Sequence, residues 1–248
     1  MGRVKGKIAI VTGGAQGLGE AIALRLAEEG ALVNIFDIIE AKDLVNKIQD
    51  SGGQSNSYIV DITNNEEIEE AVARIIDRHG QIDILVNNAG AVSAHDNLLT
   101  VTDEIWDREI AINLTGTFYC SRAVLGQMIK EEKGKIINIS SIAGDTGRPQ
   151  TSPAYSAAKA GVYGLTMSMA RSVAKYGINV NAVCPGVILT GIHDSYPKEE
   201  LDRLLSQIPY VRGGKPLDIA NAVLFLASEE SDYITGSRIR VNGGSWMG

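Results

Sequence analysis

Short apolar segments alternate with longer amphipathic segments along the chain. The apolar segments are rich in β-branched residues and are bounded by Gly, Asp or Asn, which is typical of buried strands. We expect strands at Lys7–Thr12, Leu32–Asp37, Asn56–Ile62, Ile82–Gly90 (with its turn), Gly134–Ser141, Ile178–Gly186 and Ser237–Gly244. We expect helices at Gly19–Gly30, Glu40–Gly53, Asn64–Gly80, Asp103–Glu132, around Tyr155 and Lys159, and at Pro216–Glu230.

This alternation predicts the fold class. Successive strands that are joined by helices of this length form right-handed crossovers, and the sheet is then parallel and covered on both faces. We therefore expect a doubly wound α/β sheet with three layers, α/β/α, in a single domain over residues 1–248. The irregular stretch at residues 186–214 is predicted to form a lid with a short helix at Lys198–Gln207, because long loops in compact domains are usually functional.

The composition is that of an ordinary globular protein. The 248 residues are 44% hydrophobic and 21% charged, which suffices for a large core without a disulfide or metal. The net charge of −7 gives no support for a nucleic-acid or membrane partner, and no apolar run could span a bilayer. Cys120 and Cys184 lack metal-ligand spacing, so we expect no metal and buried thiols in a reducing cytoplasm. The N-terminal residues lead directly into the first expected strand, so we expect no secretory signal.

A glycine-rich turn, TGGAQGLG (Thr12–Gly19), joins the first expected strand to the first expected helix. A plain turn is one interpretation. A strand before it and a helix after it are the context that a dinucleotide requires, because the helix N-terminus attracts a pyrophosphate. Gly13, Gly17 and Gly19 would permit the tight turn, the close ligand approach and the helix–strand contact. We therefore predict a dinucleotide site of the Rossmann type, with Leu18 beside the cofactor.

Asp37 ends the second expected strand, 18 residues after Gly19. A carboxylate there can accept hydrogen bonds from the ribose hydroxyls and would repel a 2′-phosphate. Gln16 and Ile38 stand where an NADP site would favour Arg or Lys. We therefore predict NAD as the cofactor, in contact with all three residues. The alternative for Asp37 is an ordinary turn residue.

Tyr155 and Lys159 lie four positions apart in TSPAYSAAKAG (Thr151–Gly161). Positions i and i+4 share one face of a helix, so the ammonium would lie beside the phenol. A phenol has an ordinary pKa of about 10, and a nearby cation favours the phenolate and makes proton transfer near pH 7 feasible. A solvated surface pair is the alternative. The small residues around Lys159 favour close packing of this helix instead.

Taken together, these motifs resemble the short-chain dehydrogenase/reductase family in its single-domain form. The matching positions are Thr12, Gly13, Gly17 and Gly19 of TGxxxGxG, Asn87–Gly90 of NNAG, the family's active-site positions Asn113 and Ser141, Tyr155 and Lys159 of YxxxK, and Pro185, Gly186 and Thr190 of PGxxxT. The resemblance runs from Lys7 to Gly244 with every motif in family order. It implies a Rossmann fold and hydride transfer between NAD and a small-molecule alcohol or ketone.

The resemblance also implies residue roles. Tyr155 would exchange the substrate's hydroxyl proton and Ser141 would hydrogen-bond the same oxygen. Lys159 would stabilise the phenolate and hold the nicotinamide ribose, and Asn113 would fix a water. The further cofactor contacts are Asp61 and Ile62 at the adenine, Asn88, Ala89 and Gly90 at the adenosine ribose, and Pro185, Gly186, Ile188 and Thr190 toward the nicotinamide. Ser140 competes with Ser141, but strand alternation places the two on opposite faces and the family pattern favours Ser141.

We therefore predict an NAD-dependent oxidoreductase that interconverts a secondary alcohol and a ketone. Two alternatives stay open. A 3-oxoacyl-thioester reductase of lipid synthesis usually uses NADPH, and a non-catalytic NAD-binding regulator would not need the four catalytic positions together. His95 and His193 are expected to be structural or solvent-facing. Positions near the motifs suggest a substrate pocket lined by Val92, Asp145, Val187, Leu189, Ile192, Tyr196 and Trp246.

The expected helix at Asp103–Glu132 carries an apolar stripe that includes Ile105, Ile112, Phe118 and Val124. A core role explains most of this stripe. Family members commonly pair this helix with a second subunit, so the resemblance implies a homotetramer or a homodimer.

Overall fold

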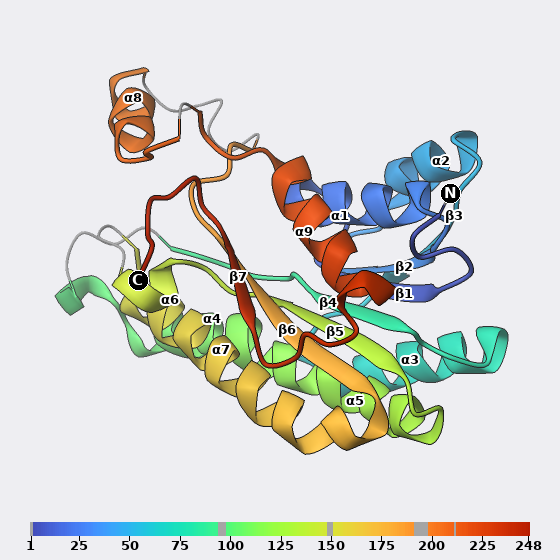
Figure 1. Cartoon of the computed structure of the whole chain (residues 1–248). Coiled ribbons are helices and arrows are strands. Elements are labelled where there is room, and N and C mark those ends of the chain that lie inside the picture. Colours follow the sequence, from blue (N-terminus) through green and yellow to red (C-terminus); the bar gives the residue numbers. More distant parts are fainter. Residues whose placement is uncertain (1, 94–97, 148–150, 191–197, 211) are drawn as a thin grey trace.

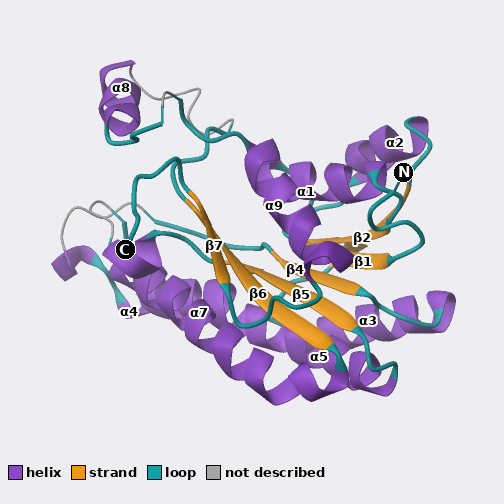
Figure 2. Ribbon diagram, in the orientation of Figure 1, coloured by secondary structure: helices purple, strands orange, loops and turns teal. Residues whose placement is uncertain are grey.

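The computed structural model describes residues 2–93, 98–147, 151–190, 198–210 and 212–248. Over these residues the chain forms a seven-stranded parallel sheet with helices packed on both faces (Figures 1 and 2). The strands are β1 (Ile8–Thr12), β2 (Leu32–Asp37), β3 (Gln54–Ile59), β4 (Ile84–Asn87), β5 (Gly134–Ile139), β6 (Ile178–Pro185) and β7 (Arg238–Val241). The predicted doubly wound fold is confirmed.

The order of the strands sets the position of the site. It is β3-β2-β1-β4-β5-β6-β7, so the chain runs from β1 to one edge and then returns to the other side of β1 with β4. The connections after β1 and β4 therefore leave the sheet in opposite directions. In open α/β sheets, this switch point opens a crevice at the carboxyl ends of the strands, where ligands bind.

Two layers of helices cover the sheet (Figure 1). The helices are α1 (Gly17–Glu28), α2 (Lys42–Asp50), α3 (Asn65–His79), α4 (Asp103–Ile110), α5 (Gly116–Lys130), α6 (Ala143–Thr146), α7 (Pro153–Val173), α8 (Lys198–Ser206) and α9 (Pro216–Ala227). Because side chains alternate along β1, Val11 packs in the core beneath α1, α2 and α9, whereas Ile10 packs in the core beneath α3, α5 and α7. Helix α8 stands outside both layers in Figure 1.

The long helix predicted at Asp103–Glu132 is one helical path with a widened turn inside it. Helix α4 leads into a π-helical turn at Ala111–Thr115, and α5 continues from there. The Gly116 N–H donates to the carbonyl oxygen of Ala111, which is the bond of a π turn. Such turns occur often at functional sites, and Asn113 lies at the centre of this one.

Several element bounds differ by a few residues from the sequence expectations, and three details are instructive. Strand β3 ends at Ile59 rather than Ile62, because the Asp61 carboxylate accepts hydrogen bonds from both the N–H and the hydroxyl of Thr63 and turns the chain. Phe118 of the predicted apolar stripe is 40% exposed, whereas Val124 of the same stripe is buried. Helix α8 ends at Ser206, one residue before the predicted end of the short helix. Within the described residues, no helix is both long and apolar enough to cross a membrane.

Candidate active site

The turns that follow β1 and β4 pack directly on each other. A Cβ on Gly13 would lie 2.7 Å from the Ala89 Cα, and a Cβ on Gly19 would lie 2.6 Å from the Asn88 Nδ2 as well as 2.0 Å from the carbonyl oxygen of Gly13. Atoms cannot approach so closely, so any larger residue would push the turns apart. These two glycines are therefore required by the contact between the turns, whether or not a ligand is present.

Hydrogen bonds of the Thr12 and Asn88 side chains join the two turns. The Thr12 hydroxyl accepts hydrogen bonds from the N–H groups of Asn88 and Ala89, both at 3.0 Å. The Asn88 side-chain amide donates to the carbonyl oxygens of Thr12 and Gly13 at 3.0 and 2.9 Å. The side-chain donor of Asn88 is thus used within the protein, and the predicted contacts of Asn88, Ala89 and Gly90 with the adenosine ribose stay predictions.

Gly17 stands in different surroundings from Gly13 and Gly19. A Cβ on Gly17 would meet no atom within 4 Å, yet its φ of +60° is in the region that favours glycine. Helix α1 begins at this residue, and its first N–H groups have no partner within the helix. Open space at a helix N-terminus suits a pyrophosphate. The residues here, with Gln16 exposed and Leu18 half-buried beside them, fit a dinucleotide.

Asp37 is held beside this turn, at the end of β2. Its carboxylate accepts hydrogen bonds from the N–H of Ala15 at 3.0 Å and the N–H of Ile39 at 3.3 Å. These bonds fix the carboxylate beside the glycine-rich turn, and its predicted contact with the adenosine ribose stays a prediction. Ile38 beside it is 70% exposed, and neither Ile38 nor Gln16 carries a positive charge that could pair with a 2′-phosphate.

Helix α7 brings Tyr155 and Lys159 onto one face, as the spacing predicts. The Lys159 Nζ lies 5.7 Å from the centroid of the Tyr155 ring and donates a 2.9 Å hydrogen bond to the carbonyl oxygen of Ile139, the last residue of β5. The lysine is only 4% exposed, and this burial lowers its pKa to about 8. Such burial does not fit the alternative of a solvated surface pair.

Ser140 and Ser141 differ in what their hydroxyls do. Ser140 is buried and donates a 2.7 Å hydrogen bond to the carbonyl oxygen of Lys159, so its hydroxyl ties β5 to α7. Ser141 is half-buried, and its oxygen accepts a hydrogen bond from the N–H of Ala143 at 3.1 Å, while among the described residues its hydroxyl donates no hydrogen bond. Of the two, Ser141 is the one suited to bind a substrate oxygen.

Asn113 is fully buried in the π turn and holds the segment after β4. Its Nδ2 donates to the carbonyl oxygens of Ala91 and Glu109 at 2.7 and 2.9 Å, and its Oδ1 accepts from the Ala91 N–H at 3.3 Å. A Cβ on Gly90 would lie 2.9 Å from this Oδ1 and 3.5 Å from the Lys159 Nζ. Asn113 and Lys159 therefore border the same small space beside Gly90.

The other predicted cofactor residues lie on the loops that follow β3 and β6. Asp61 is exposed, whereas the side chain of Ile62 is only 7% exposed and belongs to the core beneath α5. The remaining positions run along one segment that begins with the last residue of β6, namely Pro185, Gly186, Ile188 and Thr190. Their cofactor contacts stay predictions. Four other candidates lie outside the described residues: His95, Ile192, His193 and Tyr196.

Asp145 has a partner that the sequence did not reveal. Its carboxylate pairs with Arg238 and also accepts a 3.3 Å hydrogen bond from the Nε of Arg240. The Arg238 guanidinium in turn lies 4.2 Å from the centroid of the Tyr163 ring on α7. Asp145 thus links helix α6, which follows Ser141, to β7 and α7, and its predicted place in the substrate pocket stays a prediction.

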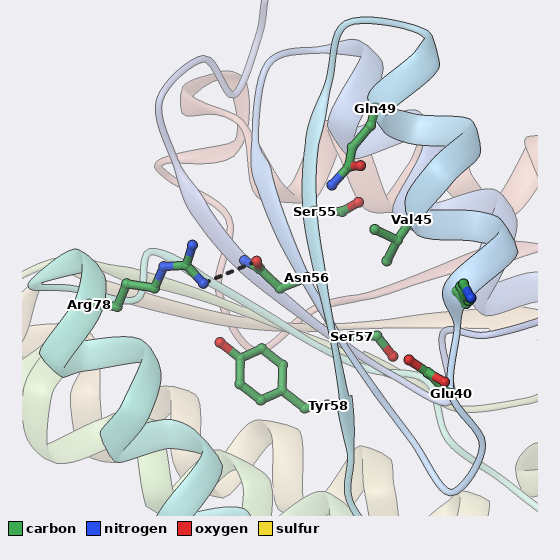
Figure 3. Close-up of a pocket in the computed structure, with 9 residues that line it drawn as sticks. Glu40, Val45, Gln49, Ser55, Asn56, Ser57, Tyr58 and Arg78 are labelled. Carbon is green, nitrogen blue, oxygen red and sulfur yellow. Dashed lines mark hydrogen bonds between the residues drawn. The ribbon is translucent and has the colours of Figure 1, made fainter.

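A separate hollow of about 360 Å³ lies along edge strand β3 (Figure 3). It is lined mainly by polar side chains, among them Asn56 and Arg78, which are joined by a 3.3 Å hydrogen bond. It contains none of the four predicted catalytic residues, and β3 lies at the opposite end of the strand order from β7. The chemistry is therefore expected at the crevice described above.

Comparison with known proteins decides the family. A family profile described as Enoyl-(Acyl carrier protein) reductase matches residues 13–245. The 3-oxoacyl-[acyl-carrier-protein] reductase FabG of Thermotoga maritima is 40% identical over 245 residues, which are 98% of this chain and 98% of the relative. The protein belongs to the short-chain dehydrogenase/reductase family. It is therefore an oxidoreductase, as the motifs predict.

Solved structures of this short-chain dehydrogenase/reductase fold agree. A provisionally named gluconate dehydrogenase from Agrobacterium tumefaciens superposes with a TM-score of 0.93 at 35% identity, covering 98% of this chain and 96% of that chain. A provisionally named 2-deoxy-d-gluconate 3-dehydrogenase from the same organism, with bound NADP, gives 0.89 at 34% identity, covering 98% and 97%. The predictions of fold and family are confirmed.

Proposed function

We propose that this short-chain dehydrogenase/reductase interconverts a ketone and a secondary alcohol, with Tyr155 as proton donor and acceptor. The observation that carries the proposal is the buried ammonium of Lys159 beside the Tyr155 ring. A cation that is held out of water stabilises a nearby phenolate strongly, because the interior dielectric is low. With its pKa lowered to about 8, Lys159 still carries its charge at neutral pH.

The proposed reaction divides the work among four side chains. In reduction, the Tyr155 hydroxyl gives its proton to the carbonyl oxygen of the substrate, and Lys159 stabilises the phenolate that remains. The Ser141 hydroxyl donates a hydrogen bond to the same oxygen, which gains negative charge in the transition state. The bound nicotinamide supplies the hydride. Asn113 fixes the backbone of Ala91 with its side chain. Oxidation moves the proton and the hydride in the opposite direction.

We propose NAD(H) as the cofactor. The support is Asp37, whose carboxylate is fixed beside the glycine-rich turn and would repel the 2′-phosphate of NADP. The neighbouring positions Gln16 and Ile38 offer no cation that could compensate. A structure of the fold has been solved with NADP, so the choice between the two dinucleotides depends on these local residues.

A 3-oxoacyl thioester is the first substrate class to test. This class is one of the alternatives that the sequence leaves open. It now stands ahead of a general alcohol or ketone, because the relative named 3-oxoacyl-[acyl-carrier-protein] reductase is 40% identical over 98% of the chain. A sugar acid with a secondary hydroxyl is the second class. It is supported by the structural likeness to proteins provisionally named gluconate dehydrogenase and 2-deoxy-d-gluconate 3-dehydrogenase.

One assay separates these possibilities. The purified protein is given NADH or NADPH with acetoacetyl coenzyme A, and NAD or NADP with gluconate and 2-deoxygluconate, and the change in dinucleotide absorbance is followed. We expect NADH-linked reduction of the thioester. Turnover of a sugar acid alone would replace the substrate class. Binding of NADH without turnover of any ketone or alcohol would support a non-catalytic regulator instead.

We also propose that residues 186–214 form a lid over this site. The base of this segment is pinned, because the Gly214 N–H donates to the carbonyl oxygen of Val187 at 3.0 Å, and the Leu189 N–H donates to that of Gly214 at 2.8 Å. Helix α8 lies between these two ends in sequence. A bound substrate is expected to protect the lid from proteolysis, and equal cleavage with and without substrate would argue against this role.

A homotetramer or homodimer in the cytoplasm completes the proposal. Phe118 on α5 and Met167 on α7 are 40% and 45% exposed, and Trp106 on α4 is 42% exposed, so this helical layer offers apolar surface to a second subunit. Cys120 and Cys184 are free and buried, which suits a reducing compartment. Sedimentation analysis tests the assembly, and a monomer at micromolar concentration would contradict it.

A further inference from the structure

Glu109 is a buried acid that neither the motifs nor the proposed reaction uses. It lies in the last turn of α4, one helical turn before Asn113, and its side chain is 0% exposed. Its Oε1 accepts a short hydrogen bond of 2.6 Å from the N–H of Ser93. Its Oε2 is buried and has no hydrogen-bond partner among the residues that the structure describes.

Such an acid is costly to keep. Burying a carboxyl group with only one of its two oxygens satisfied is unfavourable, and an apolar side chain of similar size would avoid this cost. Residues that break a local rule in this way are often retained for what they hold in place. The bond from Ser93 to Glu109 is therefore the place to look for a role.

That bond is the first of two hydrogen bonds that connect Glu109 to helix α7, which carries Tyr155. The carbonyl oxygen of Ser93 accepts a 3.1 Å hydrogen bond from the N–H of Ser152. Ser152 is fully buried and caps α7, since its hydroxyl oxygen accepts the N–H of Ala154 at 3.2 Å. Tyr155 is the next residue. Glu109 is thus connected through two backbone groups to the first turn of the helix that carries the phenol.

The same turn of helix holds the other end of the segment that follows β4. Asn113 binds both backbone groups of Ala91, and its side chain also donates to the carbonyl oxygen of Glu109. Residues 91–93 are therefore fixed at both ends by one helical turn. These residues lie between the small space beside Gly90 and the start of α7.

We propose that Glu109 is a positioning residue for Tyr155. Its carboxylate holds Ser93, Ser93 holds the N-terminus of α7, and the phenol is thereby kept in register with Ser141 and Lys159. This inference rests on the proposed role of Tyr155. Only one oxygen of the Glu109 side chain accepts the hydrogen bond from Ser93, so a neutral amide with one carbonyl oxygen can replace the carboxylate.

The test compares Glu109→Ala with Glu109→Gln. We expect Glu109→Ala to lower kcat at least about tenfold while the affinity for NADH changes by less than about twofold, since a displaced phenol impairs proton transfer and leaves the dinucleotide site intact. Glu109→Gln keeps an acceptor for the Ser93 N–H and should stay within about threefold of the wild-type kcat. Asp107→Ala, which removes an exposed acid of the same helix, is the matched control.

Two further measurements keep the outcome decisive. If Glu109→Ala does not fold, Glu109→Met fills the same space without an acceptor and takes its place. The phenolate absorbance of Tyr155, measured as the difference between each protein and its Tyr155→Phe counterpart, needs no substrate. The pH midpoint of this absorbance change should differ from the wild-type midpoint in Glu109→Ala and match it in Glu109→Gln. This comparison can be made even if the wild type turns over no ketone and the proposed function fails. Equal kcat and titration in Glu109→Ala and the wild type, or a glutamine variant as impaired as the alanine variant, would overturn the role of Glu109.

Discussion

The Lys159 ammonium is bonded to the carbonyl oxygen of Ile139 at 2.9 Å and lies 5.7 Å from the ring centroid of Tyr155. One group therefore joins the end of β5 to the face of α7. Ser141 follows Ile139 by two residues, so the bond joins α7 to the strand that leads to the serine. Lys159 therefore places a charge beside the phenol and also connects α7 to β5.

Burial of Lys159 predicts how stability depends on pH. The pKa falls from 10.5 to about 8 on folding, because the buried amine loses the solvation of its charge. Between these values the unfolded chain binds more protons than the folded protein, so the contribution of Lys159 to the free energy of unfolding rises with pH, by on the order of 3 kcal/mol. Below about pH 8 the buried charge opposes folding in full.

Urea unfolding of the wild type and Lys159→Met, near pH 7 and near pH 10, checks this sign. The advantage of the methionine variant over the wild type should shrink as the pH rises. Lys130→Met removes an exposed lysine of α5 and should show no such change. A stability difference that does not vary with pH would mean that the lysine is not buried as described.

Asp37 predicts cofactor preference. Asp37→Ala should lower kcat/KM with NADH about tenfold or more, because the ribose hydroxyls lose their acceptor, and should raise it with NADPH by removing a repulsive charge. The double change Asp37→Ala with Ile38→Arg should reverse the preference, since a guanidinium can pair with the 2′-phosphate.

The matched control for Asp37 is Asp43→Ala, which removes an exposed acid of α2 and should leave both values unchanged. A wild-type protein that prefers NADPH would contradict the role given to Asp37, whatever its substrate.

The pairing of Asp145 with two arginines predicts a loss of stability in Asp145→Asn. Asp145 is 12% exposed and its partners are each 25% exposed, so the variant would leave two partly buried guanidiniums without their counter-charge. We expect a loss of about 2 kcal/mol, less than for a fully buried pair because solvent screens the arginines.

A double-mutant cycle with Arg238→Met isolates the pair, and a coupling energy above about 0.5 kcal/mol is expected. The exposed pair of Arg3 and Glu230 provides the comparison, since Glu230→Gln should cost little at side-chain exposures of 31% and 57%. Additive effects of Asp145→Asn and Arg238→Met would show that the ion pair is not formed in solution.

Local pattern was sufficient to predict most of the fold. The run Leu32–Asp37 is a buried strand with the predicted bounds, because its apolar residues lie between the turn at Gly30 and the acid Asp37. The widened turn at Asn113 could not be predicted in the same way. The helical periodicity continues through it, and its hydrogen bonds depend on Ala91, a residue from another part of the chain.

In the candidate site, too, local spacing could be predicted, whereas contacts between distant parts of the chain could not. The spacing of Tyr155 and Lys159 is local and predicts their shared face, but the burial that lowers the pKa of Lys159 depends on the folded chain, in which the amine bonds to Ile139 at the end of β5. The partners of Asp145 lie at least 93 residues away, and those of Glu109 are backbone groups that carry no sequence signal. Roles that depend on such distant contacts become visible only in the folded protein.

The central claim is that Tyr155 exchanges the proton while the dinucleotide carries the hydride. It is tested most directly by steady-state kinetics of Tyr155→Phe with acetoacetyl coenzyme A and NADH, alongside the affinity of the variant for NADH. The account predicts that kcat falls by about 10²-fold or more while NADH binds as in the wild type. A variant that turns over at close to the wild-type rate would contradict it.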